Sequence, residues 1–588
     1  MASMDKILPF KFRTFFVLIL PFYVESEEVE IITSFGQMKG IITHNSDDQL
    51  IYQFKKIPYA LPPVGNLRFQ RPVTHGRLQG EYDATEFGPS CMQTIPNARK
   101  KYLQNSNVSE DCLHLNIYIP NNVGPNLKAV MVWIHGGAYI HGQGSRYDGS
   151  RLATIGNVVV VTVNYRLGLF GFLSTDDTFF PGNYGLWDQL EALKWIKEHI
   201  RSFGGDPDKI TLFGESAGGY SVGLLSILPR SKGLFQRVIC ESGVALSLRA
   251  VTHQMKNKSL SALQDIGCLN ESIALVTPDI VRCLQNDISS ELLLNISNLI
   301  DDEKSTFDFY ITYGPVVDGD LIPTDPRLLL KNTSSPSYQL LTSLDIMLGY
   351  NNVDGGFMLG SLTSLQKSFH YNISVGASKE VLCQGILPVV AKQYFSSNEK
   401  FTDIICGAYT DTESPEAQAT SIIHFYGDLF FGLATKGILD LHSLTFKNTY
   451  QYLFSIQPSY RSYPRTPWFR GANHGDDVAF VFGVDTYATR NTTQGERDLS
   501  KQMMRYWTNF AKTGNPNGDG QSNDSIWPSY KDNRGYIDLN VSITSHHDLY
   551  NDRLIVWEKV VPAIGEKQSY KSDWIRNLSR FCRNILMC

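Results

Sequence analysis

FGGDPDKITLFGESAGG, residues 203–219, is the stretch of sequence that decides the fold. Residues 210–213 form a short β-rich apolar run, a glycine-rich turn follows, and helical spacing resumes from about Ala217. Residues 214–218 fit G-x-S-x-G where a strand runs into a helix, which is the context that a nucleophile elbow requires. The pattern predicts that Ser216 presents its hydroxyl above the end of a strand; the alternative is a plain glycine turn before a helix.

Strand and helix signals alternate on either side of this stretch. Residues 129–134 (AVMVWI) and 158–163 (VVVVTV) are continuous apolar runs, which are typical of strands covered on both faces. Residues 186–200 carry apolar side chains at helical spacing, and Gly204-Gly205 ends that helix. The alternation predicts an α/β fold with a large, mostly parallel, twisted sheet flanked by helices. Further strands are expected at 345–348, 450–454 and 536–539, with helical insertions such as 499–512 that build a cap or gorge.

Composition excludes several classes of protein. The chain has 588 residues, of which 42% are apolar and 19% charged, and this excludes a disordered scaffold. The formal net charge is −5 and no Lys/Arg block is present, so neither a nucleic acid nor an anionic membrane is an expected partner. A small neutral or cationic substrate fits this charge better. No repeat or Pro-rich linker divides the chain, which predicts one large domain.

The first 26 residues are predicted to be a secretory signal peptide. Three basic residues precede the apolar run 15–24, and Val24 and Ser26 occupy the −3 and −1 positions of a cleavage site. The apolar run is too short to span a bilayer, which requires roughly 20 residues. A buried N-terminal helix is the alternative, which the acidic residues that follow disfavour. No later stretch reaches transmembrane length, so a secreted protein is expected.

Glycosylation and cysteine patterns agree with an oxidising, extracellular location. The nine cysteines show no metal-binding spacing, so disulfides are expected and a metal site is not. The odd number leaves at least one thiol unpaired or intermolecular. The Asn-x-Ser/Thr sequons begin at Asn107, Asn257, Asn270, Asn295, Asn332, Asn372, Asn491, Asn523, Asn540 and Asn577.

Two further motifs supply partners for Ser216. Gly136 and Gly137 directly follow the strand 129–134, so their amides, with that of Ala217, can point at one carbonyl oxygen as an oxyanion hole. The alternative is a Gly-Gly turn at a strand end. Asp354, after the strand 345–348, and His474 complete the order nucleophile, acid, base.

The motifs together resemble the type-B carboxylesterase/cholinesterase family of α/β-hydrolases, from about residue 30 to residue 562. The stretches that carry the resemblance are SEDCLHLNIY at 109–118, VWIHGGAY at 132–139, NYRLGLFGFL at 164–173, GNYGLWDQ at 182–189, GESAGG at 214–219 and HGDDVAFVFG at 474–483. The resemblance implies a hydrolase domain over residues 27–562 that cleaves carboxylic esters through an acyl-enzyme, without a cofactor. It implies that Ser216 is the nucleophile, His474 the base and Asp354 the acid.

The resemblance also implies two disulfides, Cys91 with Cys112 and Cys268 with Cys283. The pairing of four other cysteines stays open: Cys383, Cys406, Cys582 and Cys588.

The acid Asp354 distinguishes branches of this family. Cholinesterases and many carboxylesterases have Glu at this position, whereas GYNNVDGGF at 349–357 is similar to the bile-salt-activated lipase branch. SGVALS at 242–247, DGDLIPTDP at 318–326 and YWTNFAKTGNPN at 506–517 also resemble that branch. The short loop between Tyr139 and Tyr147 lacks the insertion associated there with bile salts, so bile-salt dependence is not expected.

Four residues are predicted to bind substrate. Tyr102 stands where cholinesterases have the Trp that faces the quaternary ammonium, and Phe357 matches another aromatic of that site. Phe309 and Ile311 are predicted to line the acyl pocket and to accept acyl groups larger than acetyl. A cholinesterase is therefore the alternative enzyme. An inactive, neuroligin-like adhesion protein is less expected, because all three triad positions are filled.

The C-terminal tail, residues 563–588, is predicted to be a short amphipathic helix that ends in Cys588. Its apolar residues recur at three- and four-residue spacings, and basic residues fall largely on other faces. The tail either joins two subunits into a homodimer or folds back onto the surface of its own domain, and the sequence leaves both open.

Overall fold

The computed structural model describes residues 27–45, 47–95, 107–121, 126–252, 255–269, 276–302, 311–395, 397–411, 413–460, 466–487, 492–518 and 526–563. The predicted signal peptide, all but the first residue of the predicted tail, and the predicted substrate-binding residues Tyr102 and Phe309 lie outside these ranges.

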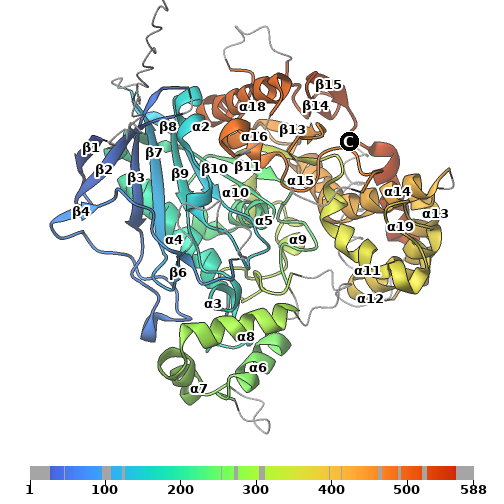
Figure 1. The fold of residues 1–588 in the computed structure, drawn as a ribbon, viewed down its shortest axis with the longest axis horizontal. Helices are drawn as coiled ribbons and strands as arrows, with labels where there is room; N and C mark the ends of the chain where they lie inside the picture. Colours follow the sequence, from blue (N-terminus) through green and yellow to red (C-terminus); the bar gives the residue numbers. More distant parts are fainter. Residues whose placement is uncertain are drawn as a thin grey trace, which may run out of the picture.

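A mixed sheet, thirteen-stranded in the described part of the chain, forms the centre of the molecule (Figure 1). Its strands follow the order β1-β2-β3-β7-β9-β8-β10-β11-β12-β13-β14-β15, and β4 pairs with β2. Neighbours in this order are parallel from β9 through β14 and antiparallel elsewhere, whereas β4 is parallel to β2. The strand bounds are β1 Glu27–Ile32, β2 Gln37–His44, β3 Leu50–Pro58, β4 Glu81–Asp83, β7 His114–Pro120, β8 Lys128–Ile134, β9 Val159–Val163, β10 Gly205–Glu215, β11 Arg237–Glu241, β12 Asp345–Asn351, β13 Thr449–Phe454, β14 Gly535–Leu539 and β15 Thr544–His547. A separate pair joins β5 Ser90–Cys91 to β6 Val108–Ser109.

Helices cover both faces of the sheet and form a group on the side opposite β1 to β4, where α11 to α14 and α19 gather (Figure 1). The helix bounds are α2 Ser150–Gly156, α3 Gly168–Phe172, α4 Tyr184–His199, α5 Ala217–Leu225, α6 Met255–Asp265, α7 Pro278–Arg282, α8 Ser290–Asp302, α9 Pro326–Leu329, α10 Pro336–Leu341, α11 Leu359–Phe369, α12 Leu387–Tyr394, α13 Glu399–Tyr409, α14 Pro415–Gly427, α15 Leu433–His442, α16 Val478–Phe482, α17 Val484–Tyr487, α18 Gln494–Thr513 and α19 Asn551–Ala563.

The continuous apolar run of β8 is explained by burial of both its faces. Val130, Val132 and Ile134 belong to the core that includes α4 and α5. Met131 and Trp133 alternate with them and belong to a second core, which includes residues of α2, α16 and α18. Because side chains of a strand alternate between faces, only a sheet covered on both sides needs apolar residues at every position. The predicted α/β fold class is therefore confirmed.

Two strands differ from their predicted extents. β10 starts at Gly205 rather than at residue 210, and its pairing with β8 is irregular between Gly205 and Ile210, where the sequence GDPDK carries no strand signal. β12 continues beyond Leu348 to Asn351, because these residues pair with β13 although glycine and asparagine are poor strand formers.

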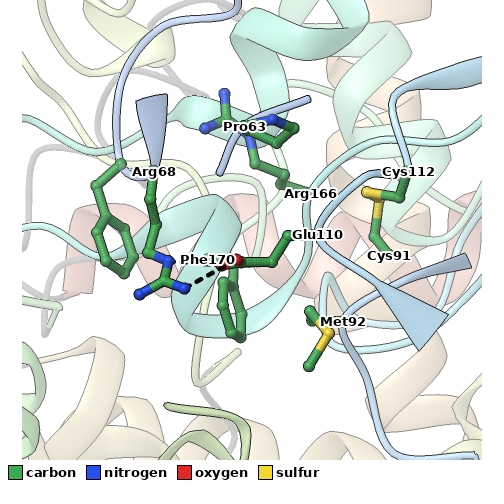
Figure 2. A pocket seen from close by; sticks show the side chains of 9 residues that line it. Pro63, Arg68, Cys91, Met92, Glu110, Cys112, Arg166 and Phe170 are labelled. Atoms are coloured by element: carbon green, nitrogen blue, oxygen red, sulfur yellow. Dashed lines mark hydrogen bonds and ion pairs between the residues drawn. A yellow bond between two sulfur atoms is a disulfide. The ribbon is translucent and has the colours of Figure 1, made fainter. Parts of the chain in front are cut away.

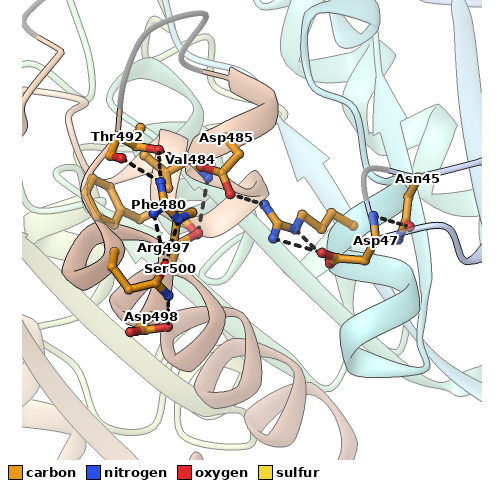
Figure 3. A network of polar contacts seen from close by, with 11 residues as sticks. Asn45, Asp47, Phe480, Val484, Asp485, Thr492, Arg497, Asp498 and Ser500 are labelled. Atoms are coloured by element: carbon orange, nitrogen blue, oxygen red, sulfur yellow. Dashed lines mark hydrogen bonds and ion pairs between the residues drawn. The ribbon is translucent and has the colours of Figure 1, made fainter.

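A network of polar contacts that includes Asp47 and Asp485 connects two distant segments of the chain (Figure 3). Arg151 of α2 is 4% exposed and forms ion pairs with Asp47 at 3.2 Å and Asp485 at 3.1 Å. The hydroxyl of Ser500 on α18 accepts a hydrogen bond from the Val484 amide, which fixes α17 against α18. A buried guanidinium requires such partners, so this network joins the loop after β2 to the C-terminal helices.

Three disulfides cross-link the described residues: Cys91–Cys112, Cys268–Cys283 and Cys383–Cys406. The thiol of Cys240 is buried on β11. Among the described helices, none combines the length and the apolar character that crossing a membrane requires.

Replacing Trp133 by Ala should destabilise the fold by about 3 to 5 kcal/mol, because a fully buried indole leaves a cavity. Its ring contacts those of Tyr147, Phe213 and Phe482 at centroid distances of 5.0, 4.8 and 5.0 Å. Denaturant unfolding followed by circular dichroism measures the change. Phe446→Ala removes a fully exposed aromatic ring and is the matched control, with an expected change within about 0.5 kcal/mol. Equal midpoints for the two variants would contradict the role given to this core.

Candidate active site

Two glycines allow the strand β10 to turn sharply into α5. A Cβ atom at Gly214 would lie 2.5 Å from the carbonyl oxygen of Ile134 at the end of β8, and one at Gly218 would lie closer still. Ser216, between them, has φ 56° and ψ −121°, a conformation that L-residues rarely adopt. The strain is held by hydrogen bonds, since the Ser216 amide donates to the carbonyl of Glu241 at 2.9 Å.

The turn brings Ser216 to the two partners that the sequence predicts. The Ser216 hydroxyl lies 2.8 Å from Nε2 of His474, and Nδ1 of His474 lies 2.6 Å from Oδ1 of Asp354. Asp354 is buried, whereas the side chain of His474 keeps 15% of its surface exposed. A hydroxyl, an imidazole and a carboxylate in this chain of hydrogen bonds have the geometry of a nucleophile, a base and an orienting acid.

Asp354 is held by two further donors that the sequence analysis did not identify. The hydroxyl of Ser242 donates to Oδ2 of Asp354 at 2.6 Å, and the amide of Asn351 donates to the same oxygen at 3.0 Å. Both oxygens of the buried carboxylate are therefore bonded, one to the imidazole and the other to the scaffold. Ser242 directly follows β11, a neighbour of β10, and this strand order is the signal that identifies it.

A second carboxylate faces the imidazole. Oε1 of Glu215 lies 3.3 Å from Nε2 of His474, and burial raises the pKa of Glu215 to about 7. Burial disfavours the charged form of His474, but the negative charges of Glu215 and Asp354 outweigh it and raise the pKa of His474 to about 9. The site therefore favours the charged form of His474.

Two more buried acids lie behind the triad. Glu241 accepts a hydrogen bond from the indole of Trp507 at 2.7 Å, and burial raises its pKa well above the ordinary value. Asp477 accepts from the Tyr452 hydroxyl at 3.0 Å, and burial together with the charge of Asp354 raises its pKa to about 6.

The predicted oxyanion-hole residues lie beside Ser216. A Cβ atom at Gly136 would lie 3.2 Å from Cβ of Ser216 and 2.6 Å from the carbonyl oxygen of Glu215, so only glycine lets the backbone approach this closely. Gly137 has φ 113°, which a residue with a side chain adopts only under strain. Ala217 is the first residue of α5, so its amide belongs to a helix N-terminus.

The structure describes two of the four predicted substrate-binding residues. The ring of Phe357 lies 5.2 Å from that of His474 and 5.8 Å from that of Phe431, which itself stacks on His474 at 4.9 Å. Phe357 is therefore part of the wall around the imidazole. Ile311 is buried and lies near Gly314 and the ring of Tyr139.

A cavity elsewhere in the molecule belongs to the scaffold (Figure 2). Its lining includes the disulfide Cys91–Cys112 and the ion pair of Arg68 with Glu110 at 2.6 Å, and it includes none of the triad residues. Both charges are largely buried, and Arg68 also donates to the carbonyl oxygens of Leu284 and Ile288 at 2.7 Å. The pair fastens the segment around the first disulfide to the segment around the second.

No group of three or more His, Cys, Asp or Glu side chains with metal-binding geometry occurs among the residues that the structure describes.

The chain is similar to several known proteins. The chain is 32% identical over 555 residues to the medium-chain fatty acyl-CoA hydrolase precursor of Anas platyrhynchos, covering 92% of this chain and 94% of that protein. It is 36% identical over 511 residues to the bile salt-activated lipase of Rattus norvegicus, covering 84% of this chain and 78% of the lipase. Neuroligin-3 of Mus musculus is 34% identical over 558 residues, covering 86% of this chain and 64% of the neuroligin.

A family model described as "Carboxylesterase family" matches residues 26–557 and confirms the predicted resemblance. With the sheet order, the strained serine turn and these relatives, the chain belongs to the carboxylesterase family.

Proposed function

We propose that this protein is a secreted serine hydrolase of carboxylic esters that acts through an acyl-enzyme. The observation that carries the proposal is the continuous hydrogen-bond chain from Ser216 through His474 to Asp354, built on a strained turn. Relatives of two kinds, esterases and neuroligins, match the chain, and the filled triad favours the hydrolase.

The proposed mechanism uses each group where it lies. His474 takes the proton of the Ser216 hydroxyl through Nε2 while the oxygen attacks the ester carbonyl. Asp354 holds the imidazole by Nδ1 and stabilises its positive charge. The amides of Gly136, Gly137 and Ala217 are assigned to the negative oxygen of the tetrahedral intermediate. The imidazolium then protonates the leaving alcohol, and a water molecule, activated by the same imidazole, hydrolyses the acyl-enzyme.

The domain over residues 27–562 is proposed to be the hydrolase, and the signal peptide 1–26 is proposed to direct secretion. Disulfides and the many sequons support an oxidising compartment. Self-association through the tail 563–588 remains a prediction.

Ser216→Ala should reduce ester turnover by as much as about 10⁶-fold while the protein still folds and is secreted, because only a hydroxyl is removed. Labelling by a fluorophosphonate probe and turnover of a neutral butyrate ester measure the loss. Ser364→Ala, whose hydroxyl bonds within its own helix, is the control and should label normally. Substantial turnover by Ser216→Ala would disprove the nucleophile.

Asp354→Asn should lower kcat by about 10⁴-fold, because an amide that donates to Nδ1 stabilises the wrong tautomer of His474. Asp354→Glu should be milder, since it keeps the charge. Steady-state kinetics with thermal unfolding as a control for stability tests both variants. If Asp354→Asn is nearly silent, the orienting acid is another residue.

Turnover should rise with pH as His474 loses its proton, with a midpoint above the ordinary histidine value of about 6.5, because Glu215 and Asp354 raise its pKa. Glu215→Gln removes one of these charges, so the midpoint should move to lower pH. The pH profile of kcat/KM on a neutral ester measures both values. Glu191→Gln, a buried carboxylate paired with Lys194 on α4, is the control and should leave the midpoint in place. A flat wild-type profile from pH 5 to 8 would contradict the base assignment.

A further inference from the structure

A positively charged side chain, that of Arg249, lies against the aromatic residues beside His474. The guanidinium carbon of Arg249 lies over the rings of Phe357 and Phe430, 5.1 and 4.8 Å from their centroids. The guanidinium carbon of Arg249 lies 5.1 Å from the ring centroid of Phe357, which lies 5.2 Å from the ring centroid of His474. The guanidinium carbon is therefore at most about 10 Å from the centre of the imidazole. A substrate acyl or alkyl chain of a few carbon atoms spans such a distance.

The loop that carries Arg249 is fixed to the triad. It begins at Ser242, whose hydroxyl binds Asp354 at 2.6 Å. Within it, the hydroxyl of Ser247 donates to the carbonyl oxygen of Phe430 at 2.8 Å. One end of the loop therefore positions the acid of the triad, and the other places Arg249 against Phe357, whose ring contacts the base.

The charge of Arg249 also affects the pKa of a side chain on α5, the helix that follows Ser216. Burial raises the pKa of Tyr220 on α5 to about 12, and the positive charge of Arg249 opposes that rise. Ser216, His474, Phe357 and Arg249 are each partly exposed. The net charge of −5 is a sum over the whole chain, whereas a bound substrate interacts with the charges near its own site.

We propose that Arg249 is a specificity-determining residue that selects carboxylic esters bearing a second, anionic group, such as half-esters of dicarboxylic acids, over neutral isosteres and choline esters. The inference rests on the proposed function and names its substrate class. A guanidinium stays charged at every physiological pH and presents a planar fork of donors that matches a carboxylate. The same charge repels a quaternary ammonium group.

The first test compares substrates that differ only in charge. Monomethyl adipate carries a carboxylate where methyl 6-methylheptanoate carries an isopropyl group of similar shape, and butyrylcholine supplies the cation. Wild-type kcat/KM should favour monomethyl adipate over its neutral isostere by about tenfold, the size of one charge-assisted hydrogen bond in a partly exposed site. The preference should shrink as salt is added. Equal kcat/KM values both within this pair and within a pair that carries the carboxylate on the alcohol side, or a preference for butyrylcholine, would overturn the proposal.

A second substrate pair locates the anion. The butyrate ester of 6-hydroxyhexanoic acid carries its carboxylate on the alcohol side, and its neutral control carries an isopropyl group there. A preference confined to this pair would support the proposal with Arg249 facing the leaving group. A preference confined to the adipate pair would support it with Arg249 facing the acyl group.

Variants separate recognition from packing. Arg249→Met keeps an unbranched stem against the rings but removes the charge, so the ratio of anionic to neutral kcat/KM should fall to about one. Arg249→Lys keeps the charge and should retain part of the ratio. Arg230→Met is the matched control, because Arg230 lies 5.3 Å from the ring centroid of Trp187, beyond the opposite end of α5 from Ser216. An unchanged ratio in Arg249→Met would show that Arg249 only packs against Phe357 and Phe430.

Binding without turnover makes this test independent of the proposed catalysis. Calorimetry with the Ser216→Ala protein should detect tighter binding of the anionic ester than of its isopropyl isostere in at least one of the two pairs, and adding Arg249→Met should abolish the difference. If the wild-type protein hydrolyses no ester but this difference is found, the proposed function fails and the role of Arg249 stands. If esters are hydrolysed and no difference is found, the role of Arg249 fails and the proposed function stands.

Discussion

The site depends on the register of four adjacent parallel strands. Ile134 of β8 pairs with Gly214 of β10, Gly214 with Cys240 of β11, and Cys240 with Leu348 of β12. Gly136, Ser216 and Ser242 each follow their strand's paired residue by two positions, and Asp354 follows Leu348 by six. Because carboxyl ends of parallel strands meet at one edge of a sheet, this register alone brings four distant segments together. A slip of one residue in any strand would turn its functional group to the opposite face.

Much of this arrangement could be predicted from the sequence, because local patterns encode it. The Gly-x-Ser-x-Gly turn requires Gly214 and Gly218, because a Cβ atom at either position would collide with the carbonyl oxygen of Ile134 at the end of β8. His474 and Asp354 were predicted through their order along the chain and through the family resemblance, and both lie within hydrogen-bond distance of their partners.

Other features arise only from tertiary contacts and left no local signal. Ser242 and Asn351 are ordinary polar residues until the sheet brings them to Asp354. The raised pKa of Glu215 depends on burial beside two other carboxylates, which no sequence window contains. The sequence did not indicate Arg249, because the overall negative charge of the chain favoured a neutral or cationic substrate. Averages over a chain do not describe a site of a few residues.

The rings around His474 restrict the orientation of its imidazole. Phe431 stacks nearly parallel to it, at an interplanar angle of 18°, while Phe357 and the hydrogen bond to Asp354 occupy other directions. An imidazole confined in this way has little rotational freedom left, so the proposed mechanism would cost it little further entropy. The same π faces attract the ring once it becomes a cation. In the proposed mechanism, Phe357 and Phe431 therefore hold the imidazole in one orientation before a substrate binds.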